Sequence, residues 1–444
     1  MSSASDINAS ELLVETLGTG NFDSPLHRFS HRQGSPYRFI TEGERVLVED
    51  NINHIRALVE SGQEIPSVEV AGPRSRIFFD PELTGMAVVT CGGLCPGLNN
   101  VIRALVLEAF YRYGIRRIYG IQNGFRGFIP EYGYEPLELS PDMVANIHHF
   151  GGTILSSSRG RQDEGRIVDW LERKEVGLLF VIGGDGSQRA ALDIHKEAKR
   201  RGAKISVIGI PKTIDNDMLF LDKSFGFETA FSRAVEAITC AHAEAKGVMN
   251  GVGLVKVMGR HSGFIACHAA LARSDVNFVL IPEVPFEMEG ERGFLAELVK
   301  RLHSRHHSVI VIAEGAGQHL LQETGKTDAS GNQILGDIGI YMRDRIEAYL
   351  HEKGVEGHLK YMDPSYLIRS VPADPQDSLY CSRLAQSAVH AAMAGKTGMI
   401  VGRWRQNYVH MPIHLVTASR QVVDADGDLW QSVLACTGQP AYFN

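Results

Sequence analysis

Short apolar segments rich in valine and isoleucine alternate with longer amphipathic segments from Met86 onward. Continuous apolar runs are typical of strands that are buried on both faces of a parallel sheet. The predicted strands are Met86–Cys91, Arg116–Ile121, Leu178–Ile182, Ile205–Ile210, Val252–Val257, Phe278–Ile281 and Val309–Ala313. The predicted helices are Asn99–Tyr113, Ser187–Arg201, Thr229–Ala245, Arg292–Arg305 and Gln333–Lys353. This repetition predicts a doubly wound α/β fold, with enough strands for two sheets.

Residues 1–85 have a different pattern, with scattered serine, asparagine, glycine and proline and only short apolar segments. Apolar residues at roughly helical spacing predict one helix over Val46–Ser61. We interpret this part as an N-terminal extension that wraps a core and not as an independent domain.

The composition narrows the function classes. With 44% hydrophobic residues among 444, the chain has too much apolar content for a mostly disordered protein. Its net charge of −7 argues against broad nucleic-acid binding. Six cysteines are too few for a disulfide scaffold, and no apolar run reaches the roughly 18 residues of a membrane span. The polar N-terminus lacks the apolar region of a signal peptide, so we expect a cytoplasmic protein with no membrane partner.

Two of the predicted strand-to-helix turns are rich in glycine, which allows positive φ and close backbone approach to a ligand. The first, CGGLCPGLNN over 91–100, suits a phosphate at a helix N-terminus or a tight connection without a ligand equally well. The second, GGDGSQ over 183–188, places Asp185 among three glycines. A bare carboxylate would repel a phosphate in the same loop, so Asp185 predicts Mg²⁺ on a nucleotide. The alternative is that Asp185 caps a helix that begins near Ser187.

The third turn, PKTIDND over 211–217, has two carboxylates just after a predicted strand. Asp215 could take a proton from a substrate hydroxyl, and Asp217 could hold Asp215 in place or bind metal. Thr213 and Lys212 could contact a phosphoryl group during its transfer. The alternative is an Asx-rich turn whose side chains bond their own backbone, and the two phosphate-type turns upstream favour the catalytic interpretation.

Further polar residues follow other predicted strands. Arg260, in MGRHSG over 258–263, lies at the expected start of a helix, where the macrodipole disfavours a cation, so it indicates an anionic partner such as a sugar phosphate. Arg159 follows a run of hydroxyl residues, and Glu314 is suited to accept hydrogen bonds from sugar hydroxyls. The segment 360–369 supplies two cations and two tyrosines.

This set matches what phosphoryl transfer requires: positioning, charge neutralisation, a metal and a proton acceptor. The chain lacks the Walker-A motif and the HRD and DFG motifs of protein kinases. The residues alone leave open a kinase of a small phosphorylated sugar and a Rossmann-like dehydrogenase, although no GxGxxG follows a predicted strand. A non-catalytic regulatory or sugar-phosphate-binding chain is a third class, and the presence of Asp185, Asp215 and Arg260 argues against it.

The motifs GGDGS (183–187), PKTIDND (211–217), MGR (258–260) and AEG (313–315) closely resemble those of 6-phosphofructokinases. The resemblance runs from about Met86 to about Lys396 and includes DPSYLIR (363–369). The pattern is most similar to the branch that includes plant and trypanosome enzymes and spirochaete pyrophosphate-dependent ones. It implies Mg²⁺-dependent phosphoryl transfer to the 1-hydroxyl of fructose 6-phosphate. It also implies a homo-oligomer, dimer or tetramer, in which a neighbouring subunit can contribute to the sugar-phosphate site.

The resemblance also implies roles for individual residues. Asp215 is expected to be the general base, with Thr213, Lys212 and Arg159 as catalytic partners and Asp185 engaging Mg²⁺. The residues expected at the donor phosphates are Gly93, Arg159, Gly183, Gly184, Asp185, Gly186 and Ser187. The residues expected at the sugar phosphate are Thr213, Asp215, Asp217, Met258, Gly259, Arg260, Glu314, Lys360, Tyr366 and Arg369.

Two residues of these motifs bear on the phosphoryl donor. In the family, ATP-dependent enzymes tend to have glycine after GGD and pyrophosphate-dependent enzymes aspartate, which would fill the space of the α-phosphate and repel it. Gly186 therefore favours ATP. Lys212 is typical of pyrophosphate-dependent enzymes, but the plant-like ATP-dependent branch combines glycine and lysine as this chain does. We expect ATP as the donor, with a pyrophosphate-dependent phosphotransferase as the alternative.

The resemblance implies two doubly wound, Rossmann-like lobes with the active site between them. The expected donor lobe comprises residues 86–227 and 370–411, and the expected sugar-phosphate lobe comprises 228–369. Residues 1–85 form the N-terminal extension and 412–444 a C-terminal segment.

Overall fold

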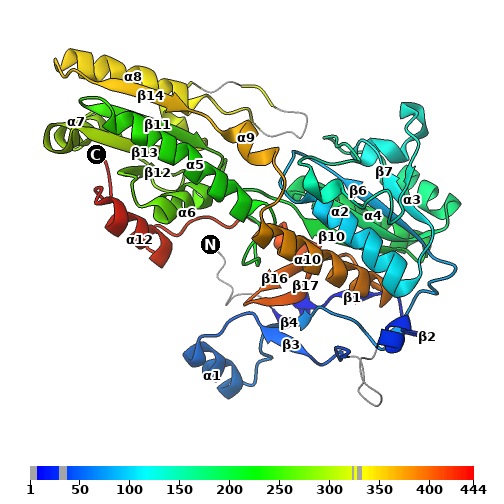
Figure 1. The fold of residues 1–444 in the computed structure, drawn as a ribbon. Helices are drawn as coiled ribbons and strands as arrows, with labels where there is room; N and C mark the ends of the chain where they lie inside the picture. The colour runs from blue at the N-terminus through cyan, green and yellow to red at the C-terminus, as the bar shows by residue number, and fades with distance from the viewer. Residues whose placement is uncertain (1–7, 30–37, 323–324, 328–332) are drawn as a thin grey trace. The chain divides into compact units, whose positions relative to one another are not determined.

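The computed structural model describes residues 8–29, 38–322, 325–327 and 333–444, and the chain divides into two compact units (Figure 1). The first unit comprises Met1–Thr213, Met218–Gly226 and Pro372–Ser419. The second comprises Ile214–Asp217, Phe227–Val371 and Arg420–Asn444. The short piece Ile214–Asp217 and the C-terminal residues Arg420–Asn444 thus belong to the same unit as the residues that follow Phe227, whereas residues 412–419 belong to the first unit.

The first unit is built on a nine-stranded mixed sheet in the order β3-β4-β17-β16-β10-β9-β6-β7-β8. Strands β16, β10, β9, β6 and β7 run parallel, whereas β8, β17, β4 and β3 are joined in antiparallel pairs. The bounds are β3 Arg45–Leu47, β4 Ser67–Val70, β6 Gly85–Thr90, β7 Ile118–Ile121, β8 Leu137–Glu138, β9 Val176–Gly183, β10 Ser206–Pro211, β16 Met399–Trp404 and β17 Asn407–Pro412. Two small pairs, β1 Glu15–Thr16 with β15 Lys396–Thr397 and β2 Phe22–Asp23 with β5 Arg76–Ile77, complete the strands.

Helices cover both faces of this sheet. Every residue of β6 and β10 is buried, as continuous apolar runs predict. Helices α3 and α4 contribute to one core with alternate residues of β6 and β9, while α10 packs against α2 and β10. The helices are α1 Ile52–Glu60, α2 Leu98–Leu107, α3 Glu164–Arg173, α4 Asp185–Arg201, α10 Pro375–Met393 and α11 Ile413–Val416.

The second unit has a four-stranded sheet that is parallel throughout, in the order β12-β13-β11-β14. Gly251 and Gly253 of β11 face the backbone of α5 at Ala245 and Ala241, where an added Cβ would clash. The opposite face packs on α7 and α8. The bounds are β11 Gly251–Val257, β12 Phe278–Leu280, β13 His307–Ala313, β14 His358–Met362, α5 Phe227–Lys246, α6 Phe264–Arg273, α7 Phe294–Arg305, α8 Ile338–Glu352, α9 Ser365–Arg369 and α12 Asp428–Thr437.

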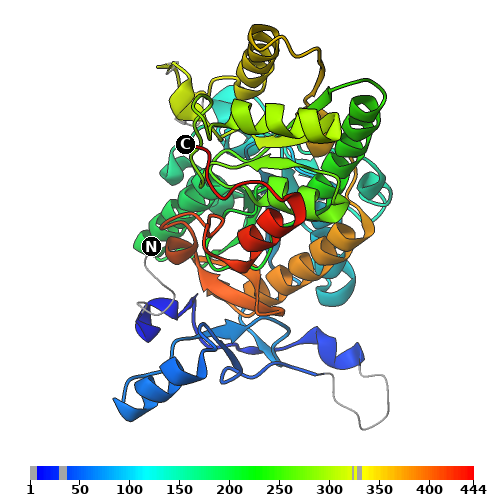
Figure 2. The same cartoon turned by 90° about the vertical axis from the view of Figure 1, so that its left-hand side faces the viewer.

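The N-terminal residues differ from the predicted pattern. The helix predicted over Val46–Ser61 covers only α1, because Arg45–Leu47 pairs with β4 and the Asn51 side chain caps the helix by accepting from the backbone N–H groups of Asn53 and His54. Helix α1 has no buried residue and projects from the strands of its own unit in Figure 2. Residues 1–7 and 30–37 of the predicted extension lie outside the described residues.

Three other predicted helix ends are wrong for local reasons. Helix α2 ends at Leu107 and continues as a π-helix over Glu108–Tyr113. Helix α8 begins at Ile338 and not at Gln333, because the Asp337 side chain caps it. Helix α4 begins two residues early, at Asp185. Within the described residues, no helix is long and apolar enough to span a membrane.

Candidate active site

In the first unit, three turns follow the parallel strands β6, β9 and β10. The register pairs Thr90 with Ile182 and Pro211 with Gly183, so these strands end side by side. Buried Lys212 joins two of the turns, since its backbone N–H donates to the Gly183 carbonyl at 3.0 Å and its Nζ to the Gly93 carbonyl at 2.8 Å. The two glycine turns predicted to bind phosphate are therefore neighbours, with a lysine ammonium next to both.

The glycines of these turns serve different purposes. An added Cβ at Gly183 would lie 2.5 Å from the Ser187 Cβ, so glycine is required there by packing. At Gly93 an added Cβ would lie 3.9 Å from Nη2 of Arg159, which places this exposed arginine beside the first turn. At Gly186 nothing lies within 4 Å, so a side chain there would enter open space. Packing within the chain does not require glycine at position 186.

Asp185 is the first residue of α4, and the residue that caps this helix is Gly184, which has no side chain. The alternative that Asp185 is the helix cap is therefore wrong. Its carboxylate forms an ion pair with Arg189 at 2.6 Å, and Arg189 also donates to the carbonyl of Thr417 at 3.1 Å. Among the described residues no three His, Cys, Asp or Glu side chains gather as a metal site. One carboxylate beside a phosphate turn fits Mg²⁺ held largely by substrate phosphates and water.

A residue that the sequence did not single out fixes these turns. Gln188 is fully buried, and its Nε2 lies within hydrogen-bond distance of the carbonyls of Val181 (3.2 Å), Gly183 (2.9 Å) and Ile210 (3.2 Å). It thus ties the ends of β9 and β10 together. The available signal was a polar residue in the first turn of a helix that packs on a buried sheet.

In the second unit, Asp215 lies in a buried, negatively charged environment. Its Oδ2 accepts a hydrogen bond of 3.4 Å from the backbone N–H of Arg260, and its carbonyl accepts one of 3.0 Å from Ser262 Oγ. Its Oδ1 is buried and has no hydrogen-bond partner within the described part of the chain. Burial and the carboxylates of Asp217 and Glu314 raise the pKa of Asp215 to about 7. A carboxyl group with this pKa and an unpartnered oxygen is suited to accept a proton near neutral pH.

The turns after β11 and β13 fit together closely. The backbone N–H of Glu314 donates to the Val257 carbonyl at 2.9 Å and that of Gly315 to the Gly259 carbonyl at 3.0 Å. Gly259 has φ +132°, a conformation that favours glycine, and an added Cβ at Gly315 would lie 2.0 Å from the Arg260 carbonyl oxygen. These contacts bring the predicted sugar residues 258–260 and 314 together.

The sequence predicts that Arg260 lies at the N-terminus of a helix, and this prediction is wrong. Helix α6 begins at Phe264 with Gly263 as its cap, so the argument from the helix macrodipole does not apply. Arg260 nevertheless has a buried Nε for which the described residues provide no hydrogen-bond acceptor. An unpartnered guanidinium nitrogen is costly to bury, so it is consistent with an anionic ligand.

Charges of both signs surround Glu314. Burial raises the pKa of this carboxyl group, and the cations of Lys256, Arg260 and Arg369 oppose the shift. Arg369 ends helix α9 and lies 4.6 Å from the ring centroid of the exposed Tyr366. The predicted residues Arg260, Glu314 and Arg369 thus belong to one electrostatic cluster. Lys360 is exposed in β14, and no hydrogen bond or ion pair joins it to this cluster in the described residues.

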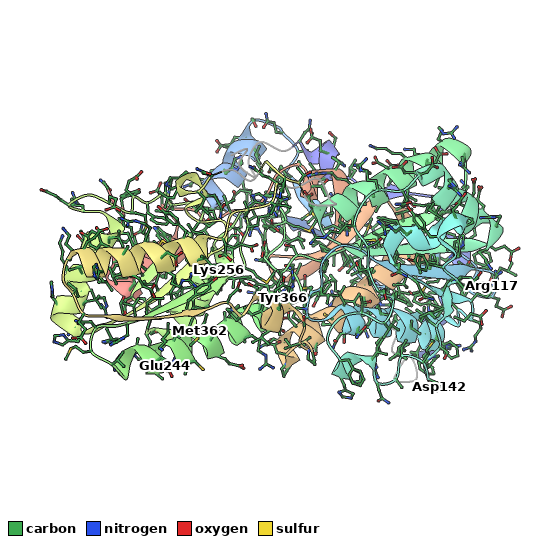
Figure 3. The ribbon with its side chains drawn as sticks, turned by 90° about the horizontal axis from the view of Figure 1, so that it is seen from above. Arg117, Asp142, Glu244, Lys256, Met362 and Tyr366 are labelled. Atoms are coloured by element: carbon green, nitrogen blue, oxygen red, sulfur yellow. The ribbon has the colours of Figure 1, made fainter. Side chains whose placement is uncertain are left out.

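Lys256, which the sequence analysis missed, connects the elements of this cluster. Its Nζ lies 3.0 Å from Asp337, which caps α8, and 2.9 Å from Asp363, which accepts from the backbone N–H of Ser365 at the start of α9. Figure 3 labels Lys256 together with Tyr366 of α9 and Met362, where β14 ends. Lys256 precedes Met258 by two residues, so it links the 258–260 turn to the helix that carries Tyr366 and Arg369. The sequence signal that could have identified Lys256 is the presence of a lysine inside an otherwise apolar predicted strand.

Asp217 has its own partner in the second unit. The side chain of Asp217 is 7% exposed, and its Oδ2 lies 2.6 Å from Nη1 of Arg420. In the first unit, half-buried Thr213 accepts a hydrogen bond from Ser224 at its carbonyl. Apart from Lys360, the predicted site residues therefore form two groups, one in each unit, and the structure adds Gln188, Ser262, Lys256 and Arg420 to them.

Comparisons with known proteins give a consistent result. A family model described as Phosphofructokinase matches residues 85–392. A protein of Amycolatopsis methanolica described as an ATP-dependent 6-phosphofructokinase is 49% identical over 98% of this chain and 96% of its own length. One of Trypanosoma cruzi with the same description is 47% identical over 83% of this chain and 76% of its own length. The crystal structure of a pyrophosphate-dependent phosphofructokinase from Marinobacter aquaeolei is similar in fold, with a TM-score of 0.65 and 22% identity over 79% of this chain and 91% of that one.

Proposed function

The chain belongs to the phosphofructokinase family, and on this premise we propose how its residues carry out the reaction. Its activity is that of an ATP-dependent 6-phosphofructokinase, a glycolytic phosphotransferase that converts fructose 6-phosphate to fructose 1,6-bisphosphate. The observation that carries this conclusion is the match to an ATP-dependent relative along nearly the full length of both chains.

Asp215 is the general base. It takes the proton of the 1-hydroxyl while the hydroxyl oxygen forms a bond to the γ-phosphorus of ATP, and the bond from that phosphorus to ADP breaks. The pKa of about 7 and the unpartnered Oδ1 support this role, because the carboxylate is available near neutral pH and strong enough to accept a proton. Two hydrogen bonds hold Asp215 in place, one from the Arg260 backbone N–H to its carboxylate and one from Ser262 to its carbonyl.

The first unit binds the donor. Glycine turns with backbone N–H groups, next to the Lys212 ammonium, suit the phosphates of ATP. Gly93, Gly183, Gly184, Gly186 and Ser187 line these phosphates, Arg159 and Thr213 contact the transferred group, and Asp185 holds Mg²⁺. When bound, the metal neutralises phosphate charge. The open space beside Gly186 supports ATP as the donor, because this space is left for a phosphate group that pyrophosphate lacks.

The second unit binds the sugar phosphate. The hydrogen-bonded turns at Met258, Gly259, Arg260 and Glu314 support binding of the sugar, with the Glu314 carboxylate as an acceptor for hydroxyl groups. Tyr366, Arg369 and Lys360 bind the 6-phosphate, and Asp217 contacts the reacting end. The chain acts as a cytoplasmic homo-oligomer, a dimer or tetramer, in line with the expectation from the sequence.

The test is an assay of the purified protein with fructose 6-phosphate and Mg²⁺, with either ATP or pyrophosphate as the donor. Turnover with ATP alone is the expected result. Turnover with pyrophosphate alone would contradict the donor assignment and make Lys212 a better indicator of the donor than Gly186. The absence of turnover with both donors would contradict the proposed reaction.

A further inference from the structure

The C-terminal segment that begins at Arg420 lies against the turn that carries the proposed base. The backbone N–H of Gln421 donates to the Asp217 carbonyl at 2.8 Å. Two residues on, the N–H of buried Val423 donates to Glu283 Oε1 at 2.7 Å, and the same oxygen accepts from the Gly263 N–H at 2.9 Å. The segment is therefore attached on one side to the Asp217 turn and on the other to the start of α6. It lies beyond residues 85–392, which the family model covers.

These backbone contacts place the Arg420 side chain on Asp217. Nη1 of Arg420 lies 2.6 Å from Asp217 Oδ2, and the Asp217 side chain is 7% exposed against 37% for Arg420. A carboxylate that is this deeply buried is costly unless a group of opposite charge is paired with it. Because Gln421 is anchored to the Asp217 backbone, little additional ordering of the Arg420 backbone is needed to form the pair.

The charges around Asp215 make this pair relevant to the reaction. The carboxylates of Asp217 and Glu314 make ionisation of Asp215 less favourable, while the Arg260 backbone N–H and the Arg420 cation favour it. His261 also lies within electrostatic range of Asp217 and Arg420. Burial, together with the cations of Arg420 and Arg260, lowers the pKa of His261, so it contributes little positive charge near neutral pH. Arg420 is thus the cation that offsets one of the two acidic neighbours of the base.

We propose that Arg420 is a positioning residue of the phosphoryl-transfer reaction, which fixes the Asp217 carboxylate and balances the charge around Asp215. This inference rests on the proposed function of Asp215. It follows that a residue beyond positions 85–392, which the family model matches, neutralises part of the negative charge in the turn that carries the proposed base.

A role in folding alone makes a different prediction. If the Arg420–Asp217 pair only held the C-terminal segment in place, its loss would lower stability and the rate at every pH without changing the shape of the pH profile. If it balances the charge around Asp215, removal of Arg420 raises the pKa of the base, and removal of the Asp217 charge lowers it.

The experiment compares the pH dependence of kcat/KM for fructose 6-phosphate in the wild type, Arg420→Gln, Arg420→Lys and Asp217→Asn. We expect the acidic limb of the kcat/KM profile to move to higher pH by about one unit in Arg420→Gln and to lower pH in Asp217→Asn. Arg420→Lys keeps the charge, so its limb is expected to stay near the wild-type position. The matched control is Arg345→Gln, which removes a cation paired with Glu289 and Glu352 elsewhere in the same unit and should leave the profile unshifted.

Thermal unfolding of each variant shows whether it is folded. A folded Arg420→Gln or Asp217→Asn variant with an unshifted limb would overturn the inference, as would an equal shift in Arg420→Lys and Arg420→Gln. Absence of wild-type turnover would instead contradict the proposed function, so the two failures are distinguishable.

Discussion

The two groups of predicted site residues, which we call the donor group in the first unit and the acceptor group in the second, differ in what they are built from. The donor group consists mainly of backbone: glycine turns at the ends of parallel strands, one ammonium and one carboxylate. The acceptor group consists of buried side-chain charge, with three carboxylates and several cations in one cluster. Backbone sites depend on local sequence, whereas a balance of buried charges depends on residues from distant parts of the chain.

The largest effect is expected at Asp215. Replacement by serine in Asp215→Ser removes the proton acceptor, and a general base typically contributes about 10² to 10⁴ in rate. We expect kcat to fall by that range while KM for fructose 6-phosphate stays nearly unchanged, as measured by steady-state kinetics. The control is Asp142→Ser at an exposed position of the first unit (Figure 3). A kcat within about twofold of wild type would mean that another group is the base.

The next prediction tests the backbone character of the donor group. We expect the Gly186→Asp variant to fold, because nothing lies within 4 Å of the Cβ that the aspartate adds. Its charge repels the α-phosphate, so ATP turnover should be lost, by about 10²-fold or more. The matched control is Gly43→Asp, another glycine with open space around it. Retained ATP turnover in Gly186→Asp would contradict the steric and electrostatic argument.

The smallest effect is expected at Lys256, which acts on the acceptor group through its partners. Lys256→Met leaves Asp337 and Asp363 without their shared cation, so α9 and its Tyr366 and Arg369 lose an anchor. We expect KM for fructose 6-phosphate to rise about tenfold with kcat and KM for ATP much less affected. Lys256→Arg should recover part of the affinity. Lys300→Met, at an exposed helix position, is the control; an equal rise in both KM values would contradict the assignment to the acceptor group.

Most of the buried parallel strands could be predicted from the sequence because they are continuous apolar runs, but β16 was missed although residues 399–402 are buried. All seven predicted strands correspond to observed ones within about two residues at each end. Strand β14 was missed because its residues are only partly buried at the sheet edge and do not form an apolar run. The start of α1 was wrong because Val46 pairs with Val68 of β4, a contact that helical spacing cannot reveal.

The candidate site was predictable where its residues follow strands in short motifs. The Asp185, Asp215, Arg260 and Glu314 motifs all lie in turns directly after parallel strands, where ligands bind in such folds. Lys256 and Arg420 could not be predicted in the same way. Lys256 lies within a strand, and Arg420 comes from a segment about 200 residues after Asp217, so only the folded chain brings each of them to its partners.

The most direct test of the account is the pH dependence of kcat/KM for fructose 6-phosphate in the wild-type protein. Asp215 must be ionised to accept the proton, and its pKa is raised to about 7 by burial and by Asp217 and Glu314. The account therefore predicts that kcat/KM is constant above this pH and falls about tenfold for each pH unit below it. A value that stays constant down to about pH 5, near the ordinary range of carboxyl groups, would contradict the claim that the acceptor group sets the pKa of its base.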